Sequence, residues 1–184
     1  MPPKQARVVE FFRAEIGTFV MRDLASLRVV KSLPMNSDTI GWCAAPLAQT
    51  LFAVLDLLGY LVRPEEGAKK TDTLKNINAV LSDSALFSIE YRNHADVLVK
   101  QYRHGLIHQF FPKAAGIARL GEDGPLFVAG PCLNVDRLEK DSIVAIQKLA
   151  SLIRSHAYES LCEQIFDRLD LLASEDWETF PTTT

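Results

Sequence analysis

Cysteine is scarce in this sequence. Cys43, Cys132 and Cys162 lie far apart, and none of their spacings matches a zinc knuckle or a dithiol redox motif. Because three is an odd number, at least one thiol has no partner within the chain. We therefore expect a protein that folds without disulfides in a reducing compartment, of which the cytoplasm is the simplest.

Long apolar runs are lacking as well. No uninterrupted run approaches the roughly 18 apolar residues that predict a membrane span. The first residues lead directly into a charged amphipathic segment, without the apolar centre and cleavage site of a secretory signal. These absences predict a soluble protein that does not engage a membrane.

Several catalytic signatures are also missing. The glycines between residues 116 and 130 are not followed by Gly-Lys-Ser or Gly-Lys-Thr, so the sequence has no phosphate-binding loop. It contains neither a serine nucleophile elbow nor a carboxylate pair at a convincing spacing. Nucleotide hydrolysis and serine hydrolysis by those routes are therefore not predicted.

What the sequence does contain is helical periodicity over most of its length. Its 184 residues are 48% hydrophobic and 23% charged, which suits one domain, residues 1–184, with its own core. Apolar residues recur at three- and four-residue steps, and the expected helices cover residues 5–30, 44–63, 71–81, 85–111 and 135–172, the last as one helix or two. We predict an all-α fold, a bundle of five or six helices with 44–63 at its centre.

One stretch interrupts the helical pattern. Glycines and prolines punctuate residues 116–130 and leave two short runs, 116–120 and 126–129, separated by Gly121-Glu122-Asp123-Gly124. Turn residues between two short runs are typical of a hairpin. The sequence therefore predicts a small β-hairpin inserted near residues 116–130.

The basic residues are unevenly distributed. The net charge is −3, yet the segment from Tyr91 to Arg119 holds five basic residues and three of the four histidines, against the single acidic residue Asp96. An acidic protein thus carries a locally basic segment, which is compatible with a polyanionic ligand.

Within this segment the run Arg103-His104-Gly105-Leu106-Ile107-His108 lies late in a long predicted helix. It resembles the Arg-x4-6-His motif of HEPN domains, an all-α family of helical bundles that carry the motif on a late helix. The residue after the arginine is commonly Asn, Asp or His in that family, and here it is His104. The hairpin at 116–130 is a departure from the minimal HEPN bundle.

The resemblance implies a metal-independent endoribonuclease that works as a homodimer without a cofactor, in a stress, toxin or phage-defence setting. His108 would act as acid and base near neutral pH, because an imidazole titrates there. Arg103 would hold the phosphate and its developing charge. His104 would orient either the phosphate or Arg103. Further basic residues would contact the RNA backbone, namely Lys100, Lys113 and Arg119. An antitoxin or another protein partner would fit the same setting.

Helix geometry adds a condition to this hypothesis. Five residues of an ideal α-helix turn the side chains of Arg103 and His108 about 140° apart. A distortion at Gly105, the length of the arginine side chain, or the partner helix of a dimer would have to bring the two groups to one phosphate.

Other interpretations of the motif remain open. Arg103 and the histidines suit the last turns of a helix, where cations favour the dipole, so a HEPN-like module could retain them for packing while binding nucleotide, RNA or protein without catalysis. His104 and His108 also share a helix face and could bind zinc, with His94 as the nearest third ligand. The glutamate that follows the first histidine in metalloprotease helices is absent, and we expect no metal.

Overall fold

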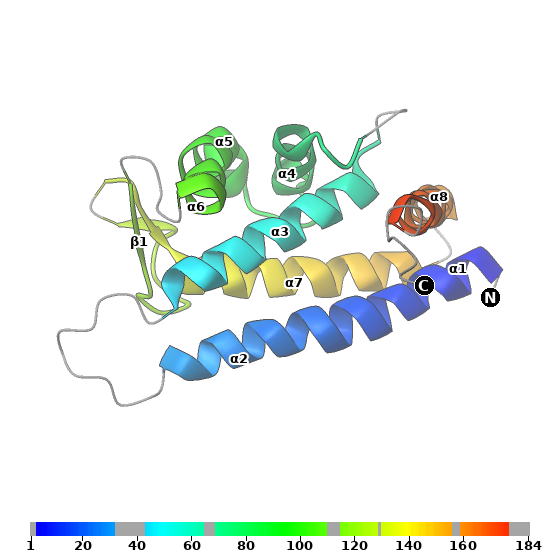
Figure 1. The fold of residues 1–184 in the computed structure, drawn as a ribbon, viewed down its shortest axis with the longest axis horizontal. Helices are drawn as coiled ribbons and strands as arrows, with labels where there is room; N and C mark the ends of the chain where they lie inside the picture. The colour runs from blue at the N-terminus through cyan, green and yellow to red at the C-terminus, as the bar shows by residue number, and fades with distance from the viewer. Residues whose placement is uncertain are drawn as a thin grey trace, which may run out of the picture.

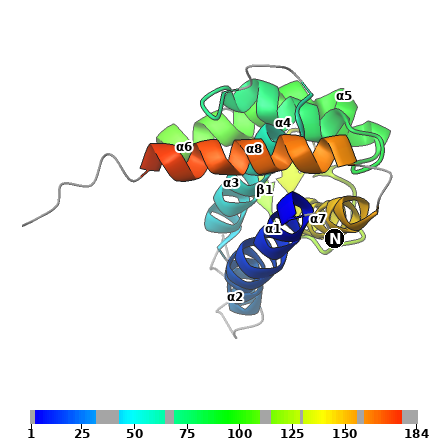
Figure 2. The same cartoon turned by 90° about the vertical axis from the view of Figure 1, so that its right-hand side faces the viewer.

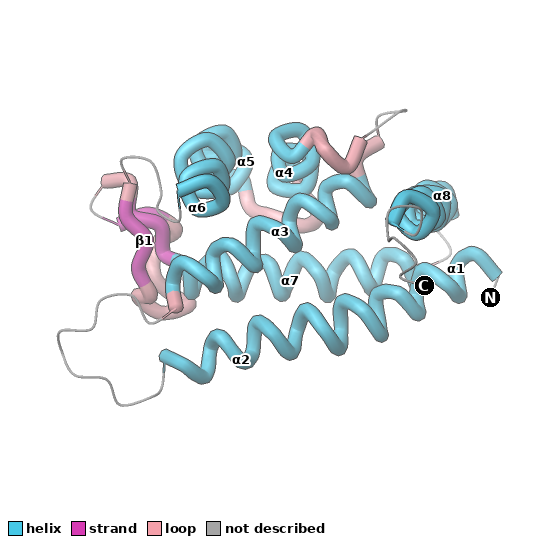
Figure 3. The backbone as a smooth tube through the Cα atoms, in the orientation of Figure 1, coloured by secondary structure: helices cyan, strands magenta, loops and turns pink. Residues whose placement is uncertain are grey.

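The computed structural model describes residues 3–31, 43–64, 69–109, 115–128, 130–155 and 159–176, except for the side chains of 30–31, 107–109 and 175–176. In this part of the chain, helices form six continuous stretches (Figures 1 and 3). They are α1–η1–α2 (Pro3–Phe11, Phe12–Val20, Met21–Lys31), α3 (Ala44–Val62), α4 (Thr73–Ser82), α5–η2–α6 (Ile89–Val97, Leu98–Arg103, His104–Gln109), α7 (Val135–Arg154) and α8 (Glu159–Asp176). The segments labelled η are π-helical.

The prediction of a mainly helical bundle is confirmed, and the open question at its C-terminal end is answered. The pattern over residues 135–172 forms two helices, because α7 ends where Ser155 takes extended backbone angles. The helix expected from residue 85 begins later, at Ile89, after a turn in which the backbone N–H of Ala85 donates to the Asp83 carboxylate.

The helices lie in two directions. The long N-terminal helix, α3 and α7 run lengthwise, whereas α4, α5–α6 and α8 cross them and are seen nearly end-on in Figure 1. Figure 2 shows α8 running horizontally across the front of the molecule, below α4 and α5 and above α1. Each lengthwise helix therefore packs against more than one partner, and the core fills the space between the two sets.

Helix α3 is the centre of the bundle. It packs against α2, α4, α7 and α8, and most of its side chains are buried. It is long and apolar enough to cross a membrane, but a buried core helix passes the same test of length and composition. Its last carbonyl groups are capped from α8, because Gln164 donates to the Leu61 oxygen and Arg168 to the Tyr60 oxygen.

The small β insertion expected near residues 116–130 is confirmed, but the expected pairing of its two runs as a hairpin is wrong. Strands β1 (Gly116–Ala118) and β2 (Phe127–Val128) do not pair with each other; both flank β3 (Cys132–Asn134), which is parallel to β1 and antiparallel to β2. The buried Asn134 side chain explains this arrangement. It donates to the oxygens of Gly121 and Pro125, so the 121–125 turn folds over β3.

Candidate functional site

Arg103 is the last residue of the π-helical segment η2. π-Helical turns are rare and occur often at functional sites. The neighbouring Tyr102 is fully buried and its hydroxyl donates to the Pro131 oxygen at 2.5 Å, while Gln49 donates to the Leu106 oxygen at 2.7 Å. These contacts fix the rotation of the helix at the motif.

The Arg103 guanidinium faces helices α3 and α4. Its Nη2 donates to the Thr73 hydroxyl at 3.1 Å and lies 3.9 Å from the Asp56 carboxylate. Thr73 donates in turn to Asp56 at 2.7 Å. The side chains of Arg103 and Asp56 are 20% and 19% exposed, so the ion pair is shielded from solvent on one side and open on the other.

Asp56 is itself held in place by α4. The buried Asn76 side chain donates to Asp56 Oδ1 at 2.9 Å and to the Lys70 oxygen at 3.2 Å. This contact depends on a close approach of the two helices at Gly59, where an added Cβ would lie 1.9 Å from the Asn76 carbonyl oxygen. The small residue in α3 therefore allows α4 to bring its polar side chains to Asp56.

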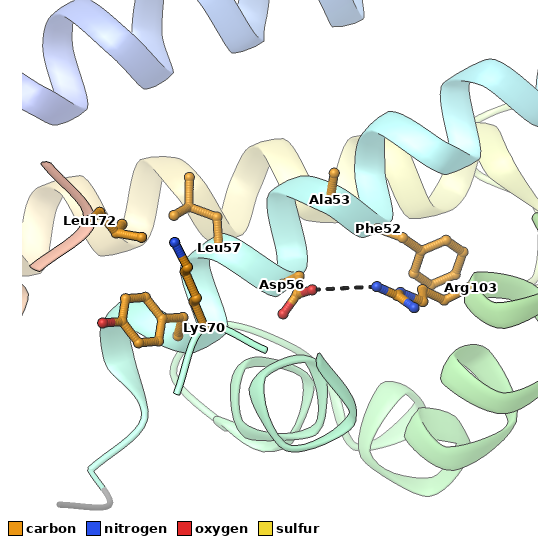
Figure 4. A pocket seen from close by; sticks show the side chains of 8 residues that line it. Phe52, Ala53, Asp56, Leu57, Lys70, Arg103 and Leu172 are labelled. Carbon is orange, nitrogen blue, oxygen red and sulfur yellow. Dashed lines mark ion pairs between the residues drawn. The ribbon is translucent and has the colours of Figure 1, made fainter. Parts of the chain in front are cut away.

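An open pocket of about 270 Å³ lies beside this network (Figure 4). Figure 4 shows Lys70 and Arg103 on opposite sides of Asp56. The remaining lining is largely apolar and consists of Phe52, Ala53, Leu57, Tyr60 and Leu172. Two cations and one carboxylate therefore line the polar side of the pocket.

A second hollow, of about 660 Å³, adjoins the first and shares Leu57 and Leu172 with it. It runs between the N-terminal helix and α8, and its other lining residues are Arg7, Phe11, Glu15, Ile16, Phe19, Val20, Leu169 and Ala173. Phe19 is 58% exposed, so this face presents apolar surface to solvent.

The two histidines of the motif lie in α6. His104 is half-buried in its first turn, and His108 belongs to the same helix while its side chain lies outside the described part. Because η2 ends at Arg103, the interval from Arg103 to His108 is α-helical. The backbone therefore keeps these two residues about 140° apart around the helix axis.

The three cations expected at an RNA backbone have different surroundings. Lys100 is exposed and forms an ion pair with Asp96 at 2.8 Å, and its hydrogen bond lowers the pKa of that carboxyl. Lys113 lies outside the described residues. The Arg119 side chain is buried in the fold.

Arg119 is buried between α2, the sheet and α7. Its Nε donates to Asp136 at 2.8 Å and its Nη1 to the Leu27 oxygen at 3.0 Å, with both charged side chains at most 3% exposed. The other Asp136 oxygen accepts the Gly121 N–H at 2.8 Å. The expectation of an exposed RNA contact at Arg119 is corrected, because this guanidinium ties the sheet to two helices.

The structure does not support the zinc alternative within the described residues. No group of three or more His, Cys, Asp or Glu side chains there is placed to hold a metal ion. The Nδ1–H of His94 donates to the Glu90 oxygen at 2.8 Å, and its ring packs 5.0 Å from that of Phe127. His94 thus supports its own helix and the sheet.

Sequence reasoning missed Asp56, Thr73 and Lys70. A signal for Asp56 was present, because it is the one charged residue between Ala44 and Val62 in an otherwise apolar helix. A carboxylate in such a helix requires a cation or several hydrogen bonds from another element. Nothing in the sequence pattern singled out Thr73 or Lys70.

Comparisons of this chain with models of protein families, with curated proteins and with solved structures found no match.

Proposed function

We propose that this chain is a HEPN-like, metal-independent endoribonuclease that cleaves single-stranded RNA as a homodimer, in a cytoplasmic stress, toxin or phage-defence setting. The observation that carries the proposal is the position of Arg103, whose guanidinium is oriented by Thr73 and Asp56 at the wall of an open pocket that also holds Lys70. A fixed cation beside an open pocket supports phosphate binding.

In the proposed reaction the ribose 2′-oxygen attacks the adjacent phosphorus. The new bond joins phosphorus to the 2′-oxygen, the bond to the 5′-oxygen breaks, and the products carry a 2′,3′-cyclic phosphate and a 5′-hydroxyl. Arg103 stabilises the charge that develops on the phosphate, and His108 transfers the proton between the attacking or leaving oxygen and solvent. His104 orients Arg103 or the phosphate.

The dimer is part of the proposal. Arg103 and His108 lie on different sides of one helix, so one chain alone does not direct both at a single phosphate. A two-fold axis near the motif would place His108 of one subunit beside Arg103 of the other. An antitoxin could block such a site by covering either residue.

A second candidate is a HEPN-like module that binds nucleotide, RNA or protein without cleaving it. The link from Arg103 through Thr73 to Asp56 favours it, because this link joins η2, α4 and α3 and would be useful for packing alone. In this case Arg103 contributes to the fold, and removing it lowers stability more than it lowers any activity.

Cleavage of a mixed single-stranded RNA in EDTA tests the proposal. The wild type should release fragments with cyclic-phosphate ends, and Arg103→Ala and His108→Ala should each lower the rate by about 10²-fold or more. Arg92→Ala is the matched control, since this exposed arginine of the same helical stretch donates to the Ser82 oxygen and does not line the pocket. It should cleave at the wild-type rate.

Circular dichroism and thermal unfolding must show that all variants are folded. Absence of cleavage by the folded, dimeric wild type would reject the nuclease and leave the binding module. Equal cleavage by Arg103→Ala would reject the role proposed for Arg103.

A further inference from the structure

We propose that the hollow between the N-terminal helix and α8 binds an organic cation with an apolar body, with the cationic group at Glu15 and the body against the surrounding apolar side chains. Arg103 does not line this hollow. The inference therefore goes beyond the proposed nuclease and does not depend on it.

Glu15 is the charge in this hollow that the fold leaves unbalanced. Among the described residues, its carboxylate forms no ion pair or hydrogen bond. A helix often balances a carboxylate with a cation three or four residues away, as Arg13 balances Glu10. The four positions at these distances from Glu15 hold no cation; they are Phe11, Phe12, Thr18 and Phe19. A cation for Glu15 would have to come from outside the described part of the chain.

The other charged residue in the lining, Arg7, already has partners. Its Nη1 lies 2.8 Å from the Asp170 carboxylate in α8, and its guanidinium lies over the Phe166 ring, 5.3 Å from the ring centroid. An anionic ligand would compete with Asp170 for Arg7 and would be repelled by Glu15, whereas a cationic ligand meets Glu15 directly. The charges of the hollow therefore favour a cation over an anion.

Two aromatic rings flank Glu15. Phe11 and Phe19 stand four residues before and after it, and all three side chains line the hollow. Phe11 is half-buried and Phe19 is exposed, so ring surface is open to a ligand. An ammonium beside these rings would add cation–π attraction to its ion pair with Glu15. Glu15 and Phe19 also belong to the π-helical segment η1, and π-helical turns are rare and occur often at functional sites.

The rest of the hollow suits the apolar body of such a ligand. Ile16 and Leu169 are buried in its lining, and Leu57 and Leu172 are half-buried. Its volume of about 660 Å³ lies within the roughly 300–1,000 Å³ typical of small-molecule sites. Such sites are mostly apolar and fix the orientation of the ligand by a few polar groups. Here Glu15 would fix the cationic end.

Three eight-carbon ligands that differ in charge test the preference: octylammonium, octanol and octanoate. Isothermal titration calorimetry, at concentrations below those at which the ligands aggregate, should give octylammonium an affinity about tenfold or more above that of octanol, because it adds a charge-assisted hydrogen bond to Glu15. Octanoate should bind more weakly than octanol. Absence of octylammonium binding, or octanoate binding as tight as that of octylammonium, would overturn the inference.

Substitutions locate the cationic group. Glu15→Gln should weaken octylammonium binding by about tenfold and leave octanol binding unchanged, a selective loss that a disturbed fold would not give. Glu163→Gln is the matched control, since it neutralises an exposed glutamate of α8 that lines neither hollow. Phe19→Leu keeps an apolar side chain but removes the ring, and it should weaken octylammonium binding by about threefold.

Arg103→Ala should keep the wild-type affinity for octylammonium while it loses RNA cleavage, which separates this site from the proposed nuclease. Equal affinity of Glu15→Gln and Glu163→Gln for octylammonium would contradict the proposal. A change in the molecular mass of Glu15→Gln or Phe19→Leu in light scattering would also contradict it, because this face would then be a contact between copies of the chain.

Discussion

Arg103 and Arg119 belong to the same basic segment, yet their guanidinium groups have different surroundings. The Arg119 side chain is 1% exposed and its charge is compensated by Asp136 inside the fold, whereas Arg103 is 20% exposed at the wall of a pocket. A buried and fully paired guanidinium has no free side for a phosphate. The number of cations in a segment therefore overstates how many can meet RNA.

Replacing Arg119 tests its structural role. Arg119→Leu should lower the free energy of unfolding by about 3–5 kcal/mol, because it leaves the Asp136 carboxylate buried without its cation. The effect is measured by urea denaturation. The control Lys100→Ala removes an exposed cation of an ion pair and should change stability by less than about 0.5 kcal/mol. If the two variants were equally stable, the buried pair would not hold the sheet as described.

For single residues, the sequence predicted which side chains are buried but not which polar groups they contact. Tyr91 and Tyr102 belong to the helical pattern over residues 85–111, and both are buried in the core. The partners of Arg119 could not be predicted, because Leu27 and Asp136 are distant in the sequence and periodicity reports only which face of an element is apolar. For the same reason, the contact between Arg103 and Thr73 could not be predicted from the sequence.

At the scale of elements, the periodicity of the sequence predicted the helices but not the pairing of the strands. Residues 3–31 and 44–62 form helices close to the predicted ranges, since a repeating apolar face is a local property. Strand β3 is three residues long and pairs in parallel with β1 across an intervening loop, so no turn residue signals the pairing. The buried Asn134 that organises this loop is one polar residue at a helix start, where a cap would be the usual expectation.

The contact between α3 and α4 at Gly59 leads to a prediction for both stability and the site. Gly59→Ala should destabilise the protein by about 1–3 kcal/mol despite the better helix propensity of alanine, because the new methyl group overlaps the Asn76 carbonyl. It should also lower RNA affinity, since α4 carries Thr73, which orients Arg103. Thermal unfolding and anisotropy measure the two effects.

Gly17→Ala is the matched control for this change. Its Cβ would meet a single backbone oxygen, that of Phe12, at 3.2 Å, which a small shift relieves. It should destabilise less than Gly59→Ala and leave RNA affinity unchanged. Equal effects of the two variants would show that the close approach of α3 and α4 is not important for the site.

At the scale of the whole molecule, the proposed nuclease requires two chains. Light scattering should give twice the 20.5 kDa mass of the chain. A mixture of Arg103→Ala and His108→Ala proteins, each inactive alone, should recover about a quarter of the wild-type rate after subunit exchange, because half of the dimers then contain one intact shared site. A strict monomer, or no recovery after demonstrated exchange, would contradict a site shared between subunits.

The packing of α1 against α8 has a consequence for synthesis. Lys4 and Arg7 in the first helix form ion pairs with Asp167 and Asp170 in the last, and Gln5 donates to the Ile153 oxygen near the end of α7. The ribosome makes α1 before α8, so at ordinary translation speeds α1 waits on the order of ten seconds for this partner, with Val8 and Phe12 uncovered. Folding of this chain can be completed only after translation has passed α8, and a stalled or truncated product would present an apolar helix to chaperones and proteases.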